Sequence, residues 1–170
     1  GGGLGLALSK DIVELHGGRI EIQSPPPGRT KGTAVVISLP IVESPTLLVV
    51  DDDPAVLALL SEQVSSHGYR VITAENGIEA LSRVKDRRPD MVILDLVLPG
   101  MDGSEVILQM RGDKDVMRIP VIVVTGAHVG RVKGEILSSF AIPALSKPWQ
   151  ESELLDRVEG AFLGASAFSL

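Results

Sequence analysis

Short apolar runs alternate with helical patterns through residues 46–170, and this alternation most constrains what the chain can fold into. The apolar runs, each of a length typical of a strand, are residues 46–50, 69–74, 90–95, 119–124 and 142–146. The helical patterns that follow them are residues 54–68, 76–88, 104–111, 128–140 and 151–163. Five strand–helix units predict an α/β fold in which helices cover both faces of a parallel sheet. Nearly unbroken apolar runs agree with strands that are buried on both sides.

Three aspartates follow directly on the first apolar run, in the segment LLVVDDDPAV. Pro54 favours the first position of a helix, and Asp53 before it is a natural N-cap. Asp51 and Asp52 have no such local role. They lie at the carboxyl end of a strand, which is where ligands gather in doubly wound sheets.

Asp95, Thr125 and Lys147 also fall at or just after the ends of predicted strands. In the usual order 2-1-3-4-5, the first and third strands are neighbours, so we expect Asp51, Asp52 and Asp95 to share one small space. Two carboxylates about 4 Å apart repel by roughly 4 kcal/mol at an effective dielectric constant of about 20. A cluster of three acids therefore predicts a bound cation.

The residue types available indicate which cation this is. The chain has no cysteine and only three histidines, so a hard, oxygen-binding ion fits best, namely Mg2+ or, in its place, Mn2+. A lysine and a threonine hydroxyl facing such an ion can hold the oxygens of a phosphoryl group. The residues therefore indicate phosphoryl transfer onto an aspartate that acts as the nucleophile.

Composition excludes several other classes of function. Without cysteine there are no disulfides, thiolate metal sites or cysteine nucleophiles. No apolar run approaches the ~20 residues of a membrane-spanning helix, so we expect a soluble, cytoplasmic protein with no membrane contact of its own. The net charge of −6, without a basic stripe, argues against nucleic acid as a direct partner.

Residues 1–40 follow a different pattern, with a helix over 4–18 and strands over 19–24 and 33–40. One helix and two strands bury too little surface to be stable alone, so we interpret residues 1–40 as the end of a larger domain. Residues 41–45, which end in Pro45, are predicted to be a linker, and residues 46–170 the second domain. The chain begins without methionine, which favours a processed protein or a fragment.

Four segments in register, LLVVDDDPAV, MVILDLVLPGMDG, VIVVTGA and LSKPW, resemble the signature of receiver domains in two-component phosphorelays. The resemblance implies a flavodoxin-like fold for residues 46–170. It also implies that Asp95 accepts a phosphoryl group from the phosphohistidine of a histidine kinase or of a histidine phosphotransfer protein.

The same resemblance implies roles for the residues around Asp95. Asp52 would bind the magnesium directly and Asp51 through water, and the backbone carbonyl of Val97 would be a further ligand. Lys147 would pair with Asp95 and its phosphate, and Thr125 would bond the phosphate. The Lys147–Pro148 peptide would be cis.

Some residues depart from the family's pattern. Ala144 stands where many receivers carry an aromatic side chain that moves inward on activation. Val97 offers no polar group to position an attacking water, so we expect slow self-dephosphorylation. Gly130 and Gly134 both fall in the helical pattern 128–140 and weaken it, so we expect this helix to be the mobile element.

Residues 1–45 resemble the end of a histidine-kinase ATPase domain, on the segments GGGLGLALSKDIVELHGG and GTAVVISLP. Gly1, Gly3 and Gly5 would be what remains of a nucleotide-phosphate loop. The resemblance implies the C-terminal part of a hybrid histidine kinase. Because other ATP-binding parts and the phosphoacceptor histidine are missing here, ATP would bind only to the intact parent protein.

Two alternatives remain open at this level. Asp51 and Asp53 are also spaced like the nucleophile and general acid of haloacid-dehalogenase-like phosphatases, which depend on magnesium. The chain could also be a receiver-fold interaction module that is never phosphorylated. For Asp102 we expect only a capping role at the start of the helix near Gly103.

Overall fold

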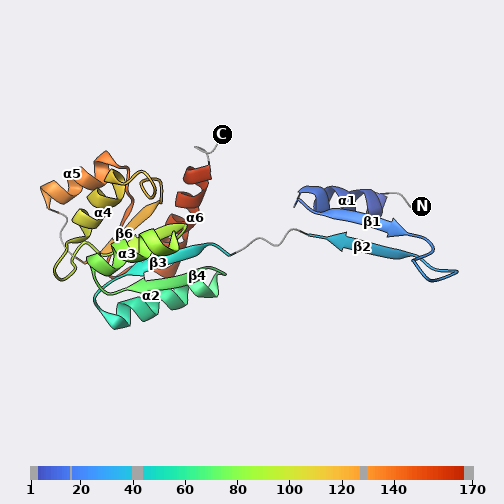
Figure 1. Ribbon diagram of the computed structural model, residues 1–170, viewed down its shortest axis with the longest axis horizontal. Helices are drawn as coiled ribbons and strands as arrows, with labels where there is room; N and C mark the ends of the chain where they lie inside the picture. Colours follow the sequence, from blue (N-terminus) through green and yellow to red (C-terminus); the bar gives the residue numbers. More distant parts are fainter. Residues whose placement is uncertain (1–3, 16, 40–43, 127–129, 167–170) are drawn as a thin grey trace. The chain divides into compact units, whose positions relative to one another are not determined.

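The computed structural model describes residues 4–15, 17–39, 44–126 and 130–166, and the chain divides into two units, Gly1–Glu43 and Ser44–Leu170 (Figure 1). The first unit holds α1 (Leu4–Leu15), β1 (Arg19–Gln23) and β2 (Ala34–Ser38). The second holds β3 (Thr46–Val50), α2 (Pro54–Ser66), β4 (Arg70–Ala74), α3 (Gly77–Arg87), β5 (Met91–Leu94), α4 (Gly103–Gly112), β6 (Val121–Thr125), α5 (Arg131–Ser139), β7 (Ala144–Ser146) and α6 (Glu151–Ser166).

The second unit is built on a five-stranded sheet with the order β4-β3-β5-β6-β7, and every pairing in it is parallel. This is the predicted 2-1-3-4-5 order, so the fold class is confirmed. In the pairing of β3 with β5, Val50 lies opposite Leu94. The residues that follow these two strands therefore emerge side by side at the same edge of the sheet.

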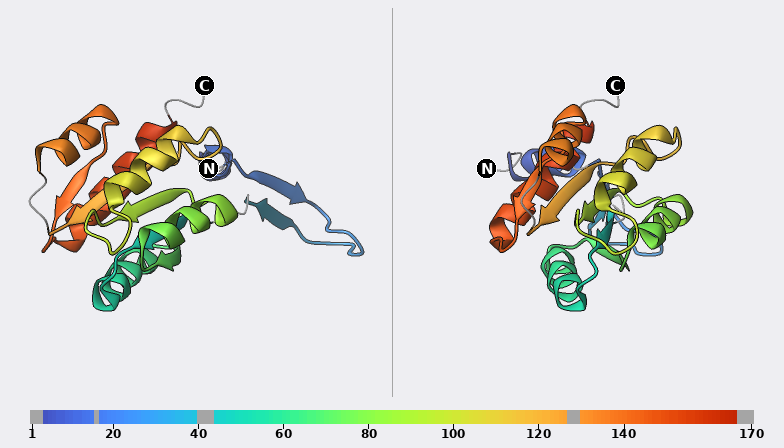
Figure 2. Two further views of the ribbon diagram at one scale, coloured as in Figure 1. Left: turned by 60° about the vertical axis from the view of Figure 1, so that its left-hand side comes forward. Right: turned by 90° about the vertical axis from the view of Figure 1, so that its left-hand side faces the viewer.

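Helices cover both faces of this sheet (Figures 1 and 2). Each face has its own aliphatic core. Along β3 the side chains alternate: Leu48 and Val50 pack into one core, and Leu47 and Val49 into the other. The first core also takes buried side chains from α3, α4 and α5, and the second from α2 and α6. This double burial explains why the strands are apolar throughout.

Two aspartates set where helices begin. The Asp53 carboxylate accepts a hydrogen bond from Ala55 N (2.8 Å) at the start of α2, and the Asp102 carboxylate accepts one from Ser104 N (2.9 Å) at the start of α4. Both predicted N-caps are confirmed. Each cap satisfies a backbone N–H that the helix itself leaves without a partner.

The α5 helix differs from its prediction at the start. It begins at Arg131, and Gly130 is its N-cap residue in an extended conformation, so only Gly134 lies inside the helix. Residues 128 and 129 of the expected helix lie outside the described part of the chain. The glycine penalty expected within the helix is therefore about 1 kcal/mol rather than twice that.

The first unit leaves much of its apolar surface in solvent. Its β1 and β2 strands pair antiparallel, and Val13 of α1 is the buried apolar side chain of this unit among the described residues. Leu8, Ile12 and Ile37, by contrast, are at least half exposed. None of the helices in the described ranges of either unit is long and apolar enough to span a membrane.

Gly103 is the position at which we expect the fold to be least tolerant of a side chain. A Cβ there would clash with the carbonyl oxygen of Asp95 and lie 2.8 Å from Cα of Leu96. We expect Gly103→Ala to lower the free energy of unfolding by roughly 1–3 kcal/mol, as overpacking does, measured by urea denaturation.

Gly112→Ala at the other end of α4 is the matched control, because a Cβ there meets nothing within 4 Å. This variant should be neutral or gain up to about 1 kcal/mol, since alanine restricts the unfolded chain. Equal effects of the two substitutions would contradict the close approach of α4 to the backbone of Asp95.

Candidate functional site

Three carboxylates meet at the carboxyl edge of the sheet. Asp51, Asp52 and Asp95 each offer an oxygen, and these oxygens all lie within 4.8 Å of one another. The sheet itself causes this, because Asp51 follows β3 and Asp95 follows the neighbouring β5. Asp95 N also donates a hydrogen bond to Val50 O (3.0 Å), which ties the two strand ends together.

The backbone orients the two buried carboxylates. Asp51 is 1% exposed and Asp95 6%, whereas Asp52 faces solvent. Oδ1 of Asp51 accepts a hydrogen bond from Asp53 N (3.0 Å), and Oδ1 of Asp95 accepts one from Val97 N (2.9 Å). One oxygen of each carboxylate is therefore held in place, and the other is left to meet a cation.

Lys147 supplies that cation. Its ammonium donates to Oδ2 of Asp51 and to Oδ2 of Asp95, both at 2.5 Å. The residue is held at the edge of the sheet because Lys147 N donates to Thr125 O (3.0 Å), directly beyond the pairing of β6 with β7. The Lys147–Pro148 peptide is cis, as expected.

The pKa shifts show how strongly these groups interact. Burial raises the pKa of Asp51, although hydrogen bonds from Lys147 and from Asp53 N act in the opposite direction. Burial also lowers the pKa of Lys147, but its bonds to the two carboxylates outweigh this effect and leave it raised. Lys147 therefore stays charged at neutral pH, and its ammonium contacts two of the three carboxylates.

The cluster has the chemistry of a magnesium site. Its donors are carboxylate oxygens from three side chains, two of them nearly buried, and Lys147 neutralises only part of their charge. A hard divalent cation with carboxylate and water ligands would compensate the remainder. The residues present therefore fit Mg2+ at this position.

For most of the other predicted site residues, the structure gives a position in the fold and the exposure of the side chain. Thr125 is 3% exposed at the end of β6, on the same edge as the carboxylates, and Val97 follows two residues after Asp95 with a half-exposed side chain. Ala144 opens β7 with its side chain exposed. Gly5 lies in α1, whereas Gly1 and Gly3 lie outside the described residues.

Residues 47–159 match the family described as "Response regulator receiver domain". The chain belongs to this family. It is the phosphorylatable signalling domain of two-component systems, and its members typically bind Mg2+ at an aspartate cluster. Residues 1–43 separately match the family described as "Histidine kinase-, DNA gyrase B-, and HSP90-like ATPase".

Curated relatives share the receiver domain. The chain is 41% identical over 112 residues to "Response regulator MprA" of Mycobacterium tuberculosis, a match that covers 66% of this chain and 48% of the relative. The chain thus spans about half the length of the MprA relatives that it matches. It is also 32% identical over 120 residues to "Protein PilH" of Pseudomonas aeruginosa, covering 69% of this chain and 98% of that protein.

Solved structures share the fold of the receiver. The signal receiver domain of a signal transduction histidine kinase from Syntrophus aciditrophicus superposes with a TM-score of 0.65 at 26% identity, covering 71% of this chain and 92% of that one. The chemotaxis protein CheY4 of Vibrio cholerae gives a TM-score of 0.63 at 26% identity, covering 69% and 98%.

One ion pair beside the receiver's acidic cluster was missed by sequence reasoning. Lys133 on α5 contacts Oδ2 of Asp102 at 2.5 Å, and its ammonium lies 3.5 Å from the carbonyl oxygen of Leu96. It therefore links α5 to the N-cap of α4 and to the residue after Asp95. No local pattern signals a pair whose members are 31 residues apart.

The Lys133–Asp102 pair predicts a pH-dependent contribution to stability. Burial raises the pKa of Asp102, but hydrogen bonds from Lys133 and Ser104 outweigh it, so the pKa lies below its usual value of 3.8. A carboxyl with a depressed pKa stabilises the fold above the unfolded pKa and loses that effect as the pH falls through the folded one. We expect Lys133→Met to lower the free energy of unfolding by about 0.5 kcal/mol at neutral pH, as partly exposed pairs do.

Urea denaturation at several pH values measures this effect. The difference between the native chain and Lys133→Met should shrink as the pH falls below 3.8. Lys114→Met is the control, since Lys114 is exposed and has no ion-pair partner in the described ranges. A difference that does not change with pH would show that the Asp102 carboxylate is not the group that Lys133 stabilises.

Proposed function

We propose that Asp95 is the phosphoacceptor of this receiver domain and takes its phosphoryl group from a phosphohistidine, on a histidine kinase or a histidine phosphotransfer protein. The observation that carries this proposal is the arrangement of one buried carboxylate, Asp95, between a lysine and two further carboxylates. A general interaction module would have no need of such a costly group of like charges.

The chemistry follows from this arrangement. An oxygen of Asp95 attacks phosphorus, the phosphorus–nitrogen bond breaks, and the imidazole leaves with the electron pair and takes up a proton. Lys147, already in contact with Asp95, would hold an oxygen of the transferred group, and the Thr125 hydroxyl would hold another. Asp51, Asp52, Asp95 and the carbonyl of Val97 would hold Mg2+, which supplies positive charge to the phosphoryl oxygens.

We further propose that the chain is a cytoplasmic part of a hybrid histidine kinase. In this reading residues 1–40 end an ATPase domain, residues 41–45 are a linker and residues 46–170 are the receiver. The match of residues 1–43 to the ATPase family and the exposed apolar side chains of that unit support this order. ATP, with Gly1, Gly3 and Gly5 at its phosphates, would belong to the intact parent protein.

The phosphatase alternative requires Asp53 as a general acid. In the structure the Asp53 carboxylate is engaged as the N-cap of α2, where its oxygen accepts from Ala55 N. The N-cap role by itself accounts for an acid at position 53. The geometry therefore favours Asp95 over Asp51 as the nucleophile.

Labelling with a small phosphodonor tests the acceptor. With phosphoramidate and Mg2+, intact-mass measurement should show one added phosphoryl group, and peptide mapping after acid quench should locate it on Asp95. Asp95→Asn should abolish the label, because an amide cannot form the acyl phosphate. Removing Mg2+ with a chelator should do the same to the native chain.

Asp53→Asn is the matched control, since asparagine caps helices about as well as aspartate. This variant should label like the native chain. A label on Asp51 would instead identify a phosphatase-type nucleophile. No label under any condition would leave the chain as an interaction module.

The lifetime of the phosphorylated state is a second test. The side chain of Val97 is 52% exposed beside the acceptor and has no polar group to hold an attacking water. We expect Val97→Asn to shorten the lifetime of the phosphoryl group roughly tenfold, equivalent to about 1.4 kcal/mol of barrier. Val97→Leu, which stays apolar, should leave it unchanged, and equal lifetimes for the native chain and Val97→Asn would refute this role.

A further inference from the structure

A hollow of about 540 Å³ lies at the amino ends of β6 and β7, at the opposite edge of the sheet from the carboxylates. It is lined by the end of α4, the segment before β6, the segment between α5 and β7, and α6. Its volume is within the range of small-molecule sites, which is about 300–1,000 Å³. None of the residues assigned to phosphoryl transfer lines it.

Positive charge is concentrated in this hollow although the chain carries a net charge of −6. Arg111, Arg118 and Arg157 line it against a single acid, Asp156. In the part of the chain that the structure describes, Arg118 and Arg157 make no ion pair or hydrogen bond. Two exposed guanidinium groups therefore remain available to an anion.

Arg111 is the group in this hollow that most favours a nearby anion. One of its terminal nitrogens donates to the carbonyls of Met117 (2.8 Å) and Ile119 (3.0 Å), and its guanidinium lies 5.9 Å from the ring centroid of Phe140. All these partners are neutral, and burial lowers the pKa of Arg111. A partly buried cation without a carboxylate partner among the described residues is costly, so an anion that reached it would be stabilised.

The remaining wall of the hollow is apolar. Phe140 keeps 39% of its surface exposed, and Ile142, which also lines the hollow, is buried. An aromatic ring and guanidinium planes together suit a flat ring system, which can stack on both. The hollow therefore offers a surface for a planar body next to donors for a negatively charged group.

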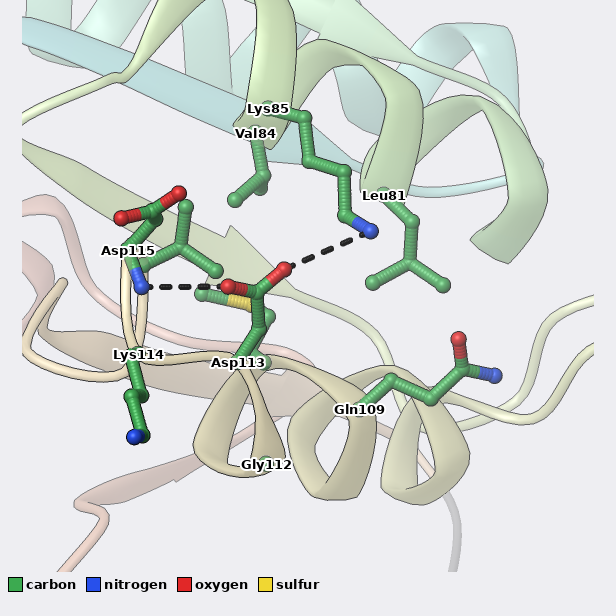
Figure 3. Close-up of a pocket in the computed structure, with 10 residues that line it drawn as sticks. Leu81, Val84, Lys85, Gln109, Gly112, Asp113, Lys114 and Asp115 are labelled. Atoms are coloured by element: carbon green, nitrogen blue, oxygen red, sulfur yellow. Dashed lines mark hydrogen bonds and ion pairs between the residues drawn. The ribbon is translucent and has the colours of Figure 1, made fainter.

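A second hollow provides a comparison, because two of the charged side chains that line it form an ion pair. It lies between α3 and α4, where Lys85 pairs with Asp113 (3.4 Å) and Asp115 N donates to the same carboxylate (3.0 Å) (Figure 3). There the opposite charges of Lys85 and Asp113 compensate each other. The arginine hollow differs because its excess positive charge has no such partner in the described residues.

We propose that the arginine hollow binds a small organic anion, a planar aromatic ring system that carries a phosphate or a carboxylate group. The anionic group would lie among Arg111, Arg118 and Arg157, and the ring against Phe140 and Ile142. This site is independent of phosphoryl transfer to Asp95.

Calorimetric titration of the whole chain with 1-naphthyl phosphate, in the absence of divalent cations, tests the proposal. The affinities for 1-naphthoate, 1-naphthol and inorganic phosphate are measured in the same way for comparison. We expect 1-naphthyl phosphate or 1-naphthoate to bind at least about tenfold more tightly than both 1-naphthol and inorganic phosphate. The better of the two anions identifies the preferred charged group.

Variants locate the binding. The double substitution Arg118→Gln/Arg157→Gln should weaken it about tenfold or more, and both side chains are exposed, so the fold should persist. Arg131→Gln, an exposed arginine of α5 outside the hollow, and Asp95→Asn should leave it unchanged. Equal binding of 1-naphthol, the absence of saturable binding, or an unaltered double variant would overturn the proposal.

Discussion

The repulsion among Asp51, Asp52 and Asp95 is the constraint on which the site of this receiver depends. The parallel pairing of β3 with β5 forces two of these carboxylates together and removes them from water. Lys147 holds the buried pair through two short contacts, but one positive charge does not balance three negative ones. The remaining negative charge favours a divalent cation at this position.

The start of α4 packs directly against the backbone of Asp95. Gly103 brings the start of α4 against the carbonyl of Asp95, and Asp102 caps that helix while it pairs with Lys133 of α5. A change at Asp95 can therefore reach α4 and α5 through packed backbone and one ion pair. This connection does not require an aromatic side chain at position 144, where the chain has Ala144.

The two edges of the sheet have opposite electrostatic character. The carboxyl edge concentrates acids, whereas the amino edge of β6 and β7 carries three arginines around an apolar wall. Both result from the same topology, because all strands of the sheet run in one direction and each edge collects loops from several of them. One small domain can in this way carry two sites that differ in charge and in ligand.

The sequence by itself determined the features that depend on neighbouring residues or on the alternation of apolar strand runs with helical patterns. Apolar runs specified the strands, Asp53 and Asp102 specified their helix caps, and strand-end acids predicted a cluster once the usual strand order was assumed. Only the tertiary structure decided the Lys133–Asp102 pair, the start of α5 after Gly130, the approach of Gly103 to Asp95 and the arginine hollow. These depend on how separate helices pack and how loops close, and local propensity and periodicity do not encode distances between segments far apart in the chain.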